Sequence, residues 1–240
     1  MPAPTTVELL WGTQQRPKRG PKPALSLDRI VTEANALADA EGLASLSMQR
    51  LAERLGFTKM SLYRYVPGRA ELTALMLDAA IGTAPAPSDS APEHWRAGLQ
   101  VWAETIFERY SAHPWAIELT TGQRPIGPNE LGWMESALVT LAGTGLTGSE
   151  RLDSIVLFNG HVRSLVQQLA STAGSSAEYA SQLAETMSAA GDQYPATVAA
   201  FAEELAGGGR DNALQFGIDR ILDGLAVLIA RRTALNCDGD

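Results

Sequence analysis

The chain has 240 residues, of which 45% are hydrophobic and 19% are charged, so it can bury a substantial core as one or two domains. Its single cysteine, Cys237, excludes a disulfide framework and a Cys/His metal site, and its net charge is -8. No apolar run approaches the roughly 20 residues that a membrane-spanning helix needs. The first 25 residues carry prolines and basic residues where a signal peptide would be apolar, so we expect a cytoplasmic protein.

The charge is unevenly distributed along the chain. Residues 14–70 hold ten Lys/Arg and five Asp/Glu, a net charge of +5, whereas residues 71–240 hold nine basic and 21 acidic residues, a net charge of -12. This asymmetry predicts an N-terminal unit that binds nucleic acid, attached to an acidic body that DNA repels.

Alanine, leucine and glutamate are abundant and alternating strand patterns are scarce, so the sequence predicts an all-α fold. Residues 1–25 are expected to form a flexible basic arm that carries Arg16, Lys18, Arg19 and Lys22. Such an arm suits the minor groove or the phosphate backbone, and the alternative is a disordered solubilising tail. Helices are expected next, at 26–41, 47–55, 58–65 and 69–81.

Residues 47–66 predict two short helices joined by a tight turn. The first helix has one apolar face, and Gly56 suits a left-handed cap at its end. Thr58 can cap the second helix, whose inward residues are Leu62 and Val66. The outer positions of this second helix are polar and basic, which is how a helix-turn-helix enters the major groove. We therefore predict that the partner is double-stranded DNA and that a three-helix helix-turn-helix unit lies within a DNA-binding domain of residues 26–83.

The remainder, residues 84–240, predicts a second helical domain. Helices are expected at 92–112, 129–142, 149–171, 177–189, 195–206 and 212–232. The helix at 149–171 has two apolar stripes, one of them at the spacing of a coiled coil: Leu152, Ile155, Asn159, Val162, Val166 and Leu169. A helix with two apolar faces must bury both of them, one against the rest of its own subunit and the other against a second chain. We expect a homodimer through 149–171 and 212–232, with Asn159 either at the dimer interface or in a pocket.

The tryptophans of this second domain suggest an aromatic pocket for a small molecule, although ordinary core packing is the alternative for each of them. His161 and Gln168 lie on the second stripe of 149–171 and could hydrogen-bond a ligand, or could be satisfied within a core or interface. The candidate ligand-binding residues are Trp102, Trp115, Trp133, Phe158, His161 and Gln168.

The order of motifs over residues 26–80 resembles the tetracycline-repressor (TetR) family of transcriptional regulators. The matching parts are Ala40-Glu41-Gly42, the run from Leu46 to Ala52, Leu55-Gly56-Phe57, the run from Ser61 to Val66, and Arg69-Ala70-Glu71-Leu72. The second domain resembles the ligand-binding and dimerising body of the tetracycline-repressor subclass, mainly through His113-Pro114-Trp115, the apolar stripe of 149–171 and the final helix. The resemblance implies an all-helical homodimeric repressor that a small-molecule effector releases from a palindromic operator.

The resemblance also implies roles for residues at the matching positions. The recognition helix would run from Thr58 to Tyr65, with Lys59, Met60 and Ser61 reading base edges at its start. Tyr63, Tyr65 and Arg69 would grip phosphates, Gln49 would reach a base from the supporting helix, and Arg64 could serve either role. No equivalent of the drug- and magnesium-binding constellation of tetracycline repressor is found, so the effector is open and no metal or cofactor is expected.

Two other interpretations remain at this point. One is a DNA-binding regulator that a protein partner controls, with no small-molecule effector. The other is a helical enzyme or carrier that contains a helix-turn-helix-like pair of helices. The sequence lacks a Gly-rich phosphate loop after a strand and a Ser/His/Asp or Cys/His motif, so we expect no catalytic residues.

Overall fold

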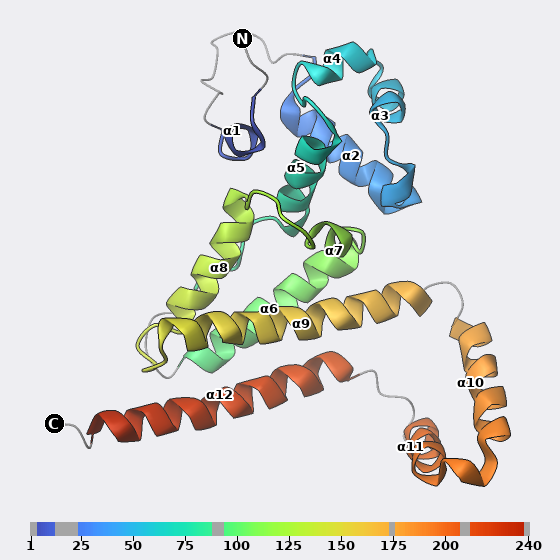
Figure 1. Ribbon diagram of the computed structural model, residues 1–240, viewed down its shortest axis with the longest axis vertical. Helices are drawn as coiled ribbons and strands as arrows, with labels where there is room; N and C mark the ends of the chain where they lie inside the picture. Colours follow the sequence, from blue (N-terminus) through green and yellow to red (C-terminus); the bar gives the residue numbers. More distant parts are fainter. Residues whose placement is uncertain (1–3, 13–23, 88–93, 173–175, 207–211, 238–240) are drawn as a thin grey trace.

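The computed structural model describes residues 4–12, 24–87, 94–172, 176–206 and 212–237, and these form helices and their connections with no strand (Figure 1). The all-α prediction is confirmed. The N-terminal unit, which we call the head, comprises α2 (Leu27–Glu41), the 3₁₀ turn η1 (Leu43–Ser45), α3 (Met48–Leu55), α4 (Lys59–Tyr63) and α5 (Arg69–Ile81). None of the helices in these ranges is long and apolar enough to cross a membrane.

The helices of the head begin and end where their capping residues predict. The hydroxyl oxygens of Ser26, Ser47 and Thr58 accept backbone N–H bonds at the starts of α2, α3 and α4. Gly56 ends α3 in the left-handed conformation, with φ 75° and ψ 30°. Helix α4 ends at Tyr63, two residues earlier than predicted. The amides of Tyr65 and Val66 both donate to the Leu62 carbonyl oxygen at 2.9 Å, so the chain closes in a tight turn before Pro67.

The remaining helices form the body. They are α6 (Trp95–Ala112), α7 (Ala116–Leu119), α8 (Pro128–Thr140), α9 (Gly148–Thr172), α10 (Ser176–Ala190), η2 (Gly191–Gln193), α11 (Pro195–Ala206) and α12 (Ala213–Cys237). Helix α9 packs against α6, α8 and α12, and Figure 1 shows α12 returning alongside α9 after α10 and α11. Helix α5 contacts α2 of the head and α6, α7 and α8 of the body, so it connects the two units.

The first apolar stripe of α9 is divided between two environments. Ile155, Val162 and Val166 are buried within the subunit, whereas Leu152 and Leu169 are each 44% exposed. Val156, beside this stripe, is 67% exposed. One face of α9 is therefore covered by the chain's own body and another is left open.

The N-terminal segment is not wholly the flexible arm that we expected. Residues Thr6–Leu10 form a helix, α1, with a capping box between Thr5 and Glu8. Leu10 is buried against the core, and α1 packs on α5. The Trp11 indole N–H donates to the carbonyl oxygen of Ile126 at 3.2 Å. Contacts with residues far along the chain stabilise this helix, and local spacing does not reveal them; the basic residues Arg16, Lys18, Arg19 and Lys22 lie outside the described residues.

Candidate functional site

The exposed side of α4 is the first candidate surface. The Thr58 hydroxyl lies 2.9 Å from the Ser61 hydroxyl and caps the helix. Met60 is 72% exposed although it is apolar, and Lys59 and Arg64 are also exposed. An exposed thioether between polar and basic side chains contributes nothing to the core and leaves a surface suited to contact with another molecule.

The two tyrosines of this region are held by the core beneath them. Tyr63 and Tyr65 are both partly buried against it, which corrects the simple helical expectation that residues two apart face different ways. The chain turns after Tyr63, and the Tyr65 amide bonds to the Leu62 carbonyl oxygen at 2.9 Å. The Lys59 ammonium lies 5.5 Å from the centre of the Tyr63 ring, a distance at which a cation is attracted to the ring face.

Other predicted DNA-binding residues have partners within the head. The Gln49 amide donates to Glu53 Oε1 at 2.6 Å. Arg69 donates to the carbonyl oxygens of Leu46 at 3.0 Å and Leu43 at 3.3 Å, so it holds η1 against the start of α5. These two hydrogen bonds use only part of the guanidinium, which has five N–H groups.

Two arginines of the supporting helix α3 are paired with carboxylates of α2. Arg54 lies 2.6 Å from Glu33, and Arg50 pairs with Glu41. These ion pairs neutralise charge at the side of α3, and the exposed cations on α4 and just after it are Lys59 and Arg64. Exposed positive charge therefore stands at the start of α4 and just after its end.

The body contains a cavity of about 340 Å³ between α5, α6, α8 and α9, which we call the central cavity. Its apolar walls include Ile81, Trp102, Ile106, Trp133, Met134 and Ile155. Its polar side chains include Tyr110, Glu130, Asn159 and Arg163. An apolar cavity with a few converging polar groups is the usual form of a small-molecule site.

The polar groups of the central cavity are ordered by partners around them. Glu130 pairs with Arg124 through two N–O contacts of 2.6 Å. Burial, and then the negative charge of Glu130, raises the pKa of the Tyr110 phenol. Tyr110 therefore stays protonated and can donate a hydrogen bond, while Arg163 supplies a positive charge on the opposite helix.

The tryptophans of the central cavity satisfy their own N–H groups. Trp102 donates to the carbonyl oxygen of Trp133 at 2.9 Å, and Trp133 donates to the carbonyl oxygen of Gly82 at 2.9 Å. Their ring centroids lie 5.4 Å apart in an edge-to-face arrangement. A ligand in the cavity therefore meets aromatic rings whose polar atoms are already bonded.

The six predicted ligand-binding residues do not form one site. Trp102 and Trp133 line the central cavity, and the fully buried Phe158 lies behind Trp102, with 6.5 Å between ring centroids. Nε2 of His161 lies 3.1 Å from the Leu214 carbonyl oxygen, which places the imidazole between α9 and α12. The second stripe of α9 thus faces away from the central cavity, because residues 156, 159, 160 and 163 occupy the face that lines it.

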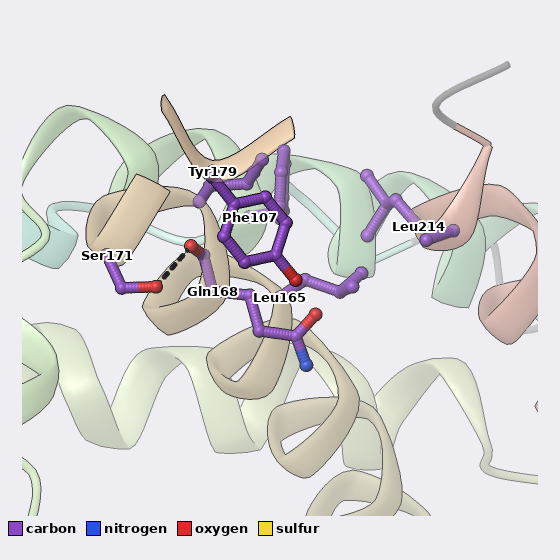
Figure 2. A pocket seen from close by; sticks show the side chains of 8 residues that line it. Phe107, Leu165, Gln168, Ser171, Tyr179 and Leu214 are labelled. Atoms are coloured by element: carbon purple, nitrogen blue, oxygen red, sulfur yellow. Dashed lines mark hydrogen bonds between the residues drawn. The ribbon is translucent and has the colours of Figure 1, made fainter. Parts of the chain in front are cut away.

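Gln168 lines a different cavity of about 500 Å³, which we call the outer cavity. Figure 2 shows Phe107, Leu165, Tyr179 and Leu214 around it, with the Ser171 hydroxyl donating to the backbone carbonyl of Gln168 at 2.7 Å. The outer cavity is the larger of the two. It has no residue of α5 in its lining, so it lacks direct contact with the helix that reaches the head.

Trp115 lies in neither of these cavities. It is buried at the junction of head and body, where its indole N–H donates to Asp39 Oδ1 at 2.6 Å. The same carboxylate oxygen lies 2.7 Å from Nδ1 of His113. Asp39 is in α2, so Trp115 contributes to the contact between the two units. It also lines a separate pocket of about 410 Å³ at this junction, together with Gly42 and Ile117.

Sequence reasoning missed most of the polar side chains of the central cavity. Tyr110, Glu130 and Arg163 belong to no sequence motif that indicates a ligand site, and the sequence allowed Asn159 either at the dimer interface or in a pocket. A charged Arg163 beside an apolar stripe was the one local signal for this site. Within the described ranges, no three His, Cys, Asp or Glu residues gather to hold a metal ion.

Comparison with known proteins matches the head and the body to models of the same protein family. Residues 30–76 match the bacterial regulatory proteins of the tetR family, and residues 86–229 match the tetracyclin repressor-like C-terminal domain. The chain is 41% identical over 237 residues to the HTH-type transcriptional repressor DrrR1 of Streptomyces coeruleorubidus, a match that covers 95% of this chain and 87% of that protein.

Solved structures agree with this assignment. Apo ActR from Streptomyces coelicolor matches with a TM-score of 0.73 and 26% identity, over 88% of this chain and 99% of that one. ActR in complex with actinorhodin matches with a TM-score of 0.71 and 28% identity, over 85% and 98% of the two chains. The helix-turn-helix order, the all-helical body and these matches together show that the chain belongs to the TetR family of DNA-binding transcriptional regulators.

Proposed function

We propose that this protein is a homodimeric repressor that leaves a palindromic operator when a small molecule binds in the central cavity. One observation carries the proposal: a single helix, α5, reaches from the DNA-binding helices to that cavity. Arg69 at its start holds η1 beside α3, and Ile81 at its end lines the cavity wall. A ligand that binds one arrangement of α5 more tightly would shift the position of the head.

In the proposed complex, α4 enters the major groove and α3 supports it from residues 26–83, the proposed DNA-binding domain. Lys59, Met60 and Ser61 are proposed to read base edges because they occupy the exposed start of α4. Thr58 and Arg64 flank them. Tyr63, Tyr65, Gln49 and Arg69 are proposed to fix the position of the helix on the backbone or at a flanking base.

The lining of the central cavity supports a particular class of effector. Two indole rings in the lining suit an aromatic molecule, and Tyr110, Asn159 and Arg163 suit oxygen acceptors or an acidic group on it. A volume of about 340 Å³ is at the lower end of the range for ligand sites. The solved complex of ActR with actinorhodin adds support, because a protein of this fold and family binds a ligand.

The exposed apolar side chains of α9 and α12 support the proposed dimer. Leu152 on α9 is 44% exposed, and Phe216 and Val227 on α12 are 61% and 53% exposed. Two copies related by a twofold axis would bury these faces against each other and set the separation of the two α4 helices. That separation must match the spacing of the operator half-sites.

The test begins with selection of the operator from random DNA duplexes by the full-length protein, followed by footprinting on the DNA that flanks its gene. The proposal expects a palindromic site with salt-dependent affinity. A panel of aromatic acids and phenols is then screened for a shift in melting temperature and for release of DNA. A regulator that a protein partner controls would bind the operator yet show no ligand-induced shift, and weak, sequence-blind binding would contradict the proposal outright.

A further inference from the structure

The start of α8 is capped by a side chain from another helix. Gly127 is the N-cap residue and has no side chain to offer, and Pro128 has no N–H. The first two amides of α8 belong to Asn129 and Glu130, and both donate to Oδ1 of Asp78, at 3.0 and 3.1 Å. Asp78 lies in the last turn of α5, so the helix that leads from the head caps a helix of the body.

The shape of the surrounding chain holds this carboxylate in place. Asp78 is only 8% exposed, and the Asn129 side-chain amide donates to its backbone carbonyl at 3.0 Å. A Cβ atom on Gly127 would lie 2.1 Å from Oδ1 of Asp78, so the close approach requires glycine at this position. Burial raises the pKa of Asp78, and the two backbone hydrogen bonds oppose that rise.

The cap is adjacent to the central cavity. The backbone N–H of Glu130 donates to Asp78, and the side chain of Glu130 lines the cavity. Arg124 holds that side chain and also donates to the carbonyl oxygen of Leu119 at 2.8 Å, which ties the end of α7 to the start of α8. One residue of α8 therefore touches the cavity through its side chain and the head's last helix through its backbone.

We propose that Asp78 is a positioning residue that couples the head to the central cavity through its cap on α8. Movement of α5 relative to α8 by about an ångström would lengthen both carboxylate–amide bonds beyond hydrogen-bond range. Two amides and a buried carboxylate would then lose their partners, which is costly, so α5 and α8 move together or the cap breaks. DNA bound to the head and a ligand beside Glu130 thereby both act on the contact between α5 and α8.

This inference rests on the proposed function but needs no effector for its test. Amide hydrogen exchange of Asn129 and Glu130 is measured in the full-length protein, free and bound to the selected operator duplex. We expect operator binding to change the exchange rate of these two amides by about tenfold or more, although they lie in the body. Amides at the start of α9, such as Glu150, whose N–H donates to Thr147, serve as an internal reference and should not change.

Three variants separate coupling from folding. Asp78→Ala should speed exchange at Asn129 and Glu130 and make it independent of DNA, while sequence-selective DNA binding persists. Asp78→Asn keeps an acceptor oxygen of the same shape and should restore part of the response to DNA. Glu150→Gln weakens a comparable cap at α9, distant from α5, and should leave the response at residues 129 and 130 as in wild type.

The outcomes separate this inference from the proposed function. If wild-type protein binds its operator selectively and exchange at Asn129 and Glu130 does not change, the coupling role of Asp78 is wrong and the repressor proposal stands. The same conclusion follows if Asp78→Ala retains the full response. If selective DNA binding is never found, the proposed function itself fails.

Discussion

The indole N–H of Trp102 donates to the backbone carbonyl oxygen of Trp133 at 2.9 Å, so two aromatic walls of the central cavity are joined by a hydrogen bond of their own. Trp133 in turn donates to Gly82 at the end of α5. The positions of the rings are thus set before any ligand arrives. A site ordered in advance loses less conformational entropy on binding.

Trp102→Phe tests this arrangement, because it retains an aromatic ring and removes the N–H donor. We expect the free energy of unfolding to fall by about 1 kcal/mol or somewhat more, from the lost hydrogen bond and the smaller ring. Urea denaturation measures the change as a lower midpoint with an unaltered slope. An unchanged midpoint would show that the bond contributes nothing net to stability.

Because Lys59 is proposed to read a base edge, Lys59→Ala should weaken operator binding and relax the sequence preference at the base pair that it reads. A loss of affinity that is equal across sequences, with the salt dependence lowered by about one counterion, would place Lys59 on a phosphate instead. Tyr63→Phe should also weaken binding. Both should leave dimerisation and melting temperature near wild type, since the Lys59 side chain is exposed and the Tyr63 ring is retained.

Arg96→Ala is the matched control for charge, because it removes one cation from the body, where Arg96 pairs with Asp223 at 2.7 Å. Titrations by fluorescence anisotropy at several salt concentrations give the affinities and slopes. Wild-type affinity in both head variants would refute the assignment of the α4 surface.

Gly217 on α12 allows the close approach of α9. A Cβ atom at this position would lie 2.1 Å from Nε2 of His161, the atom that lies 3.1 Å from the Leu214 carbonyl oxygen. Gly217→Ala should therefore displace the imidazole and destabilise the protein by about 1–3 kcal/mol. Gly132→Ala on α8 meets no atom within 4 Å and should instead stabilise by up to about 1 kcal/mol.

The double variant His161→Ala, Gly217→Ala gives the check on this explanation. Removing the imidazole removes the atom with which the new methyl group collides, so the two effects should not add. Thermal melts of the four proteins measure the coupling. Strictly additive losses would mean that Gly217 is required for another reason.

Glu150 and Arg232 join the first turn of α9 to α12. Hydrogen bonds from the Arg232 guanidinium and the Thr147 amide lower the pKa of Glu150 from its ordinary value of 4.5 to about 2. Because the folded state favours the ionised carboxylate, its contribution to stability is present above pH 4.5 and is lost as the pH falls towards 2.

Glu150→Gln should therefore melt at a lower temperature than wild type at pH 7, by a small amount that added salt reduces. The difference between the two proteins should narrow as the pH falls below 4.5. Melting curves from pH 7 to pH 3 measure it. A difference that is constant with pH would show that the charge of Glu150 is not what matters.

Val227→Glu tests the proposed dimer. Val227 is 53% exposed on α12, and a carboxylate there would face its own copy across a twofold axis, so we expect the molecular mass in solution to fall from dimer to monomer. Val101→Glu on α6 is the control, since Val101 is 50% exposed on another helix. Light scattering after size-exclusion chromatography distinguishes them, and a dimeric Val227→Glu protein would place the interface elsewhere.

The head was predictable because its determinants are local. Ser26, Ser47, Thr58 and Gly56 cap their helices within three residues of the groups they satisfy, so spacing alone locates α2, α3 and α4. The central cavity depends on which side of α9 turns inward, and both sides are apolar. Trp115 shows the same limit, because its partner Asp39 lies in the head and no pattern near Trp115 indicates it.

The docking of α1 has a consequence for the order in which the chain folds. Its partners Glu71 and Ile126 are 65 and 115 residues further along the chain than Thr6 and Trp11. A helix of five residues is not stable alone in water, so α1 has no lasting structure while the ribosome makes the head. Helix α1 is synthesised before the head, yet its contact with Ile126 can form only after the loop that precedes α8 has emerged.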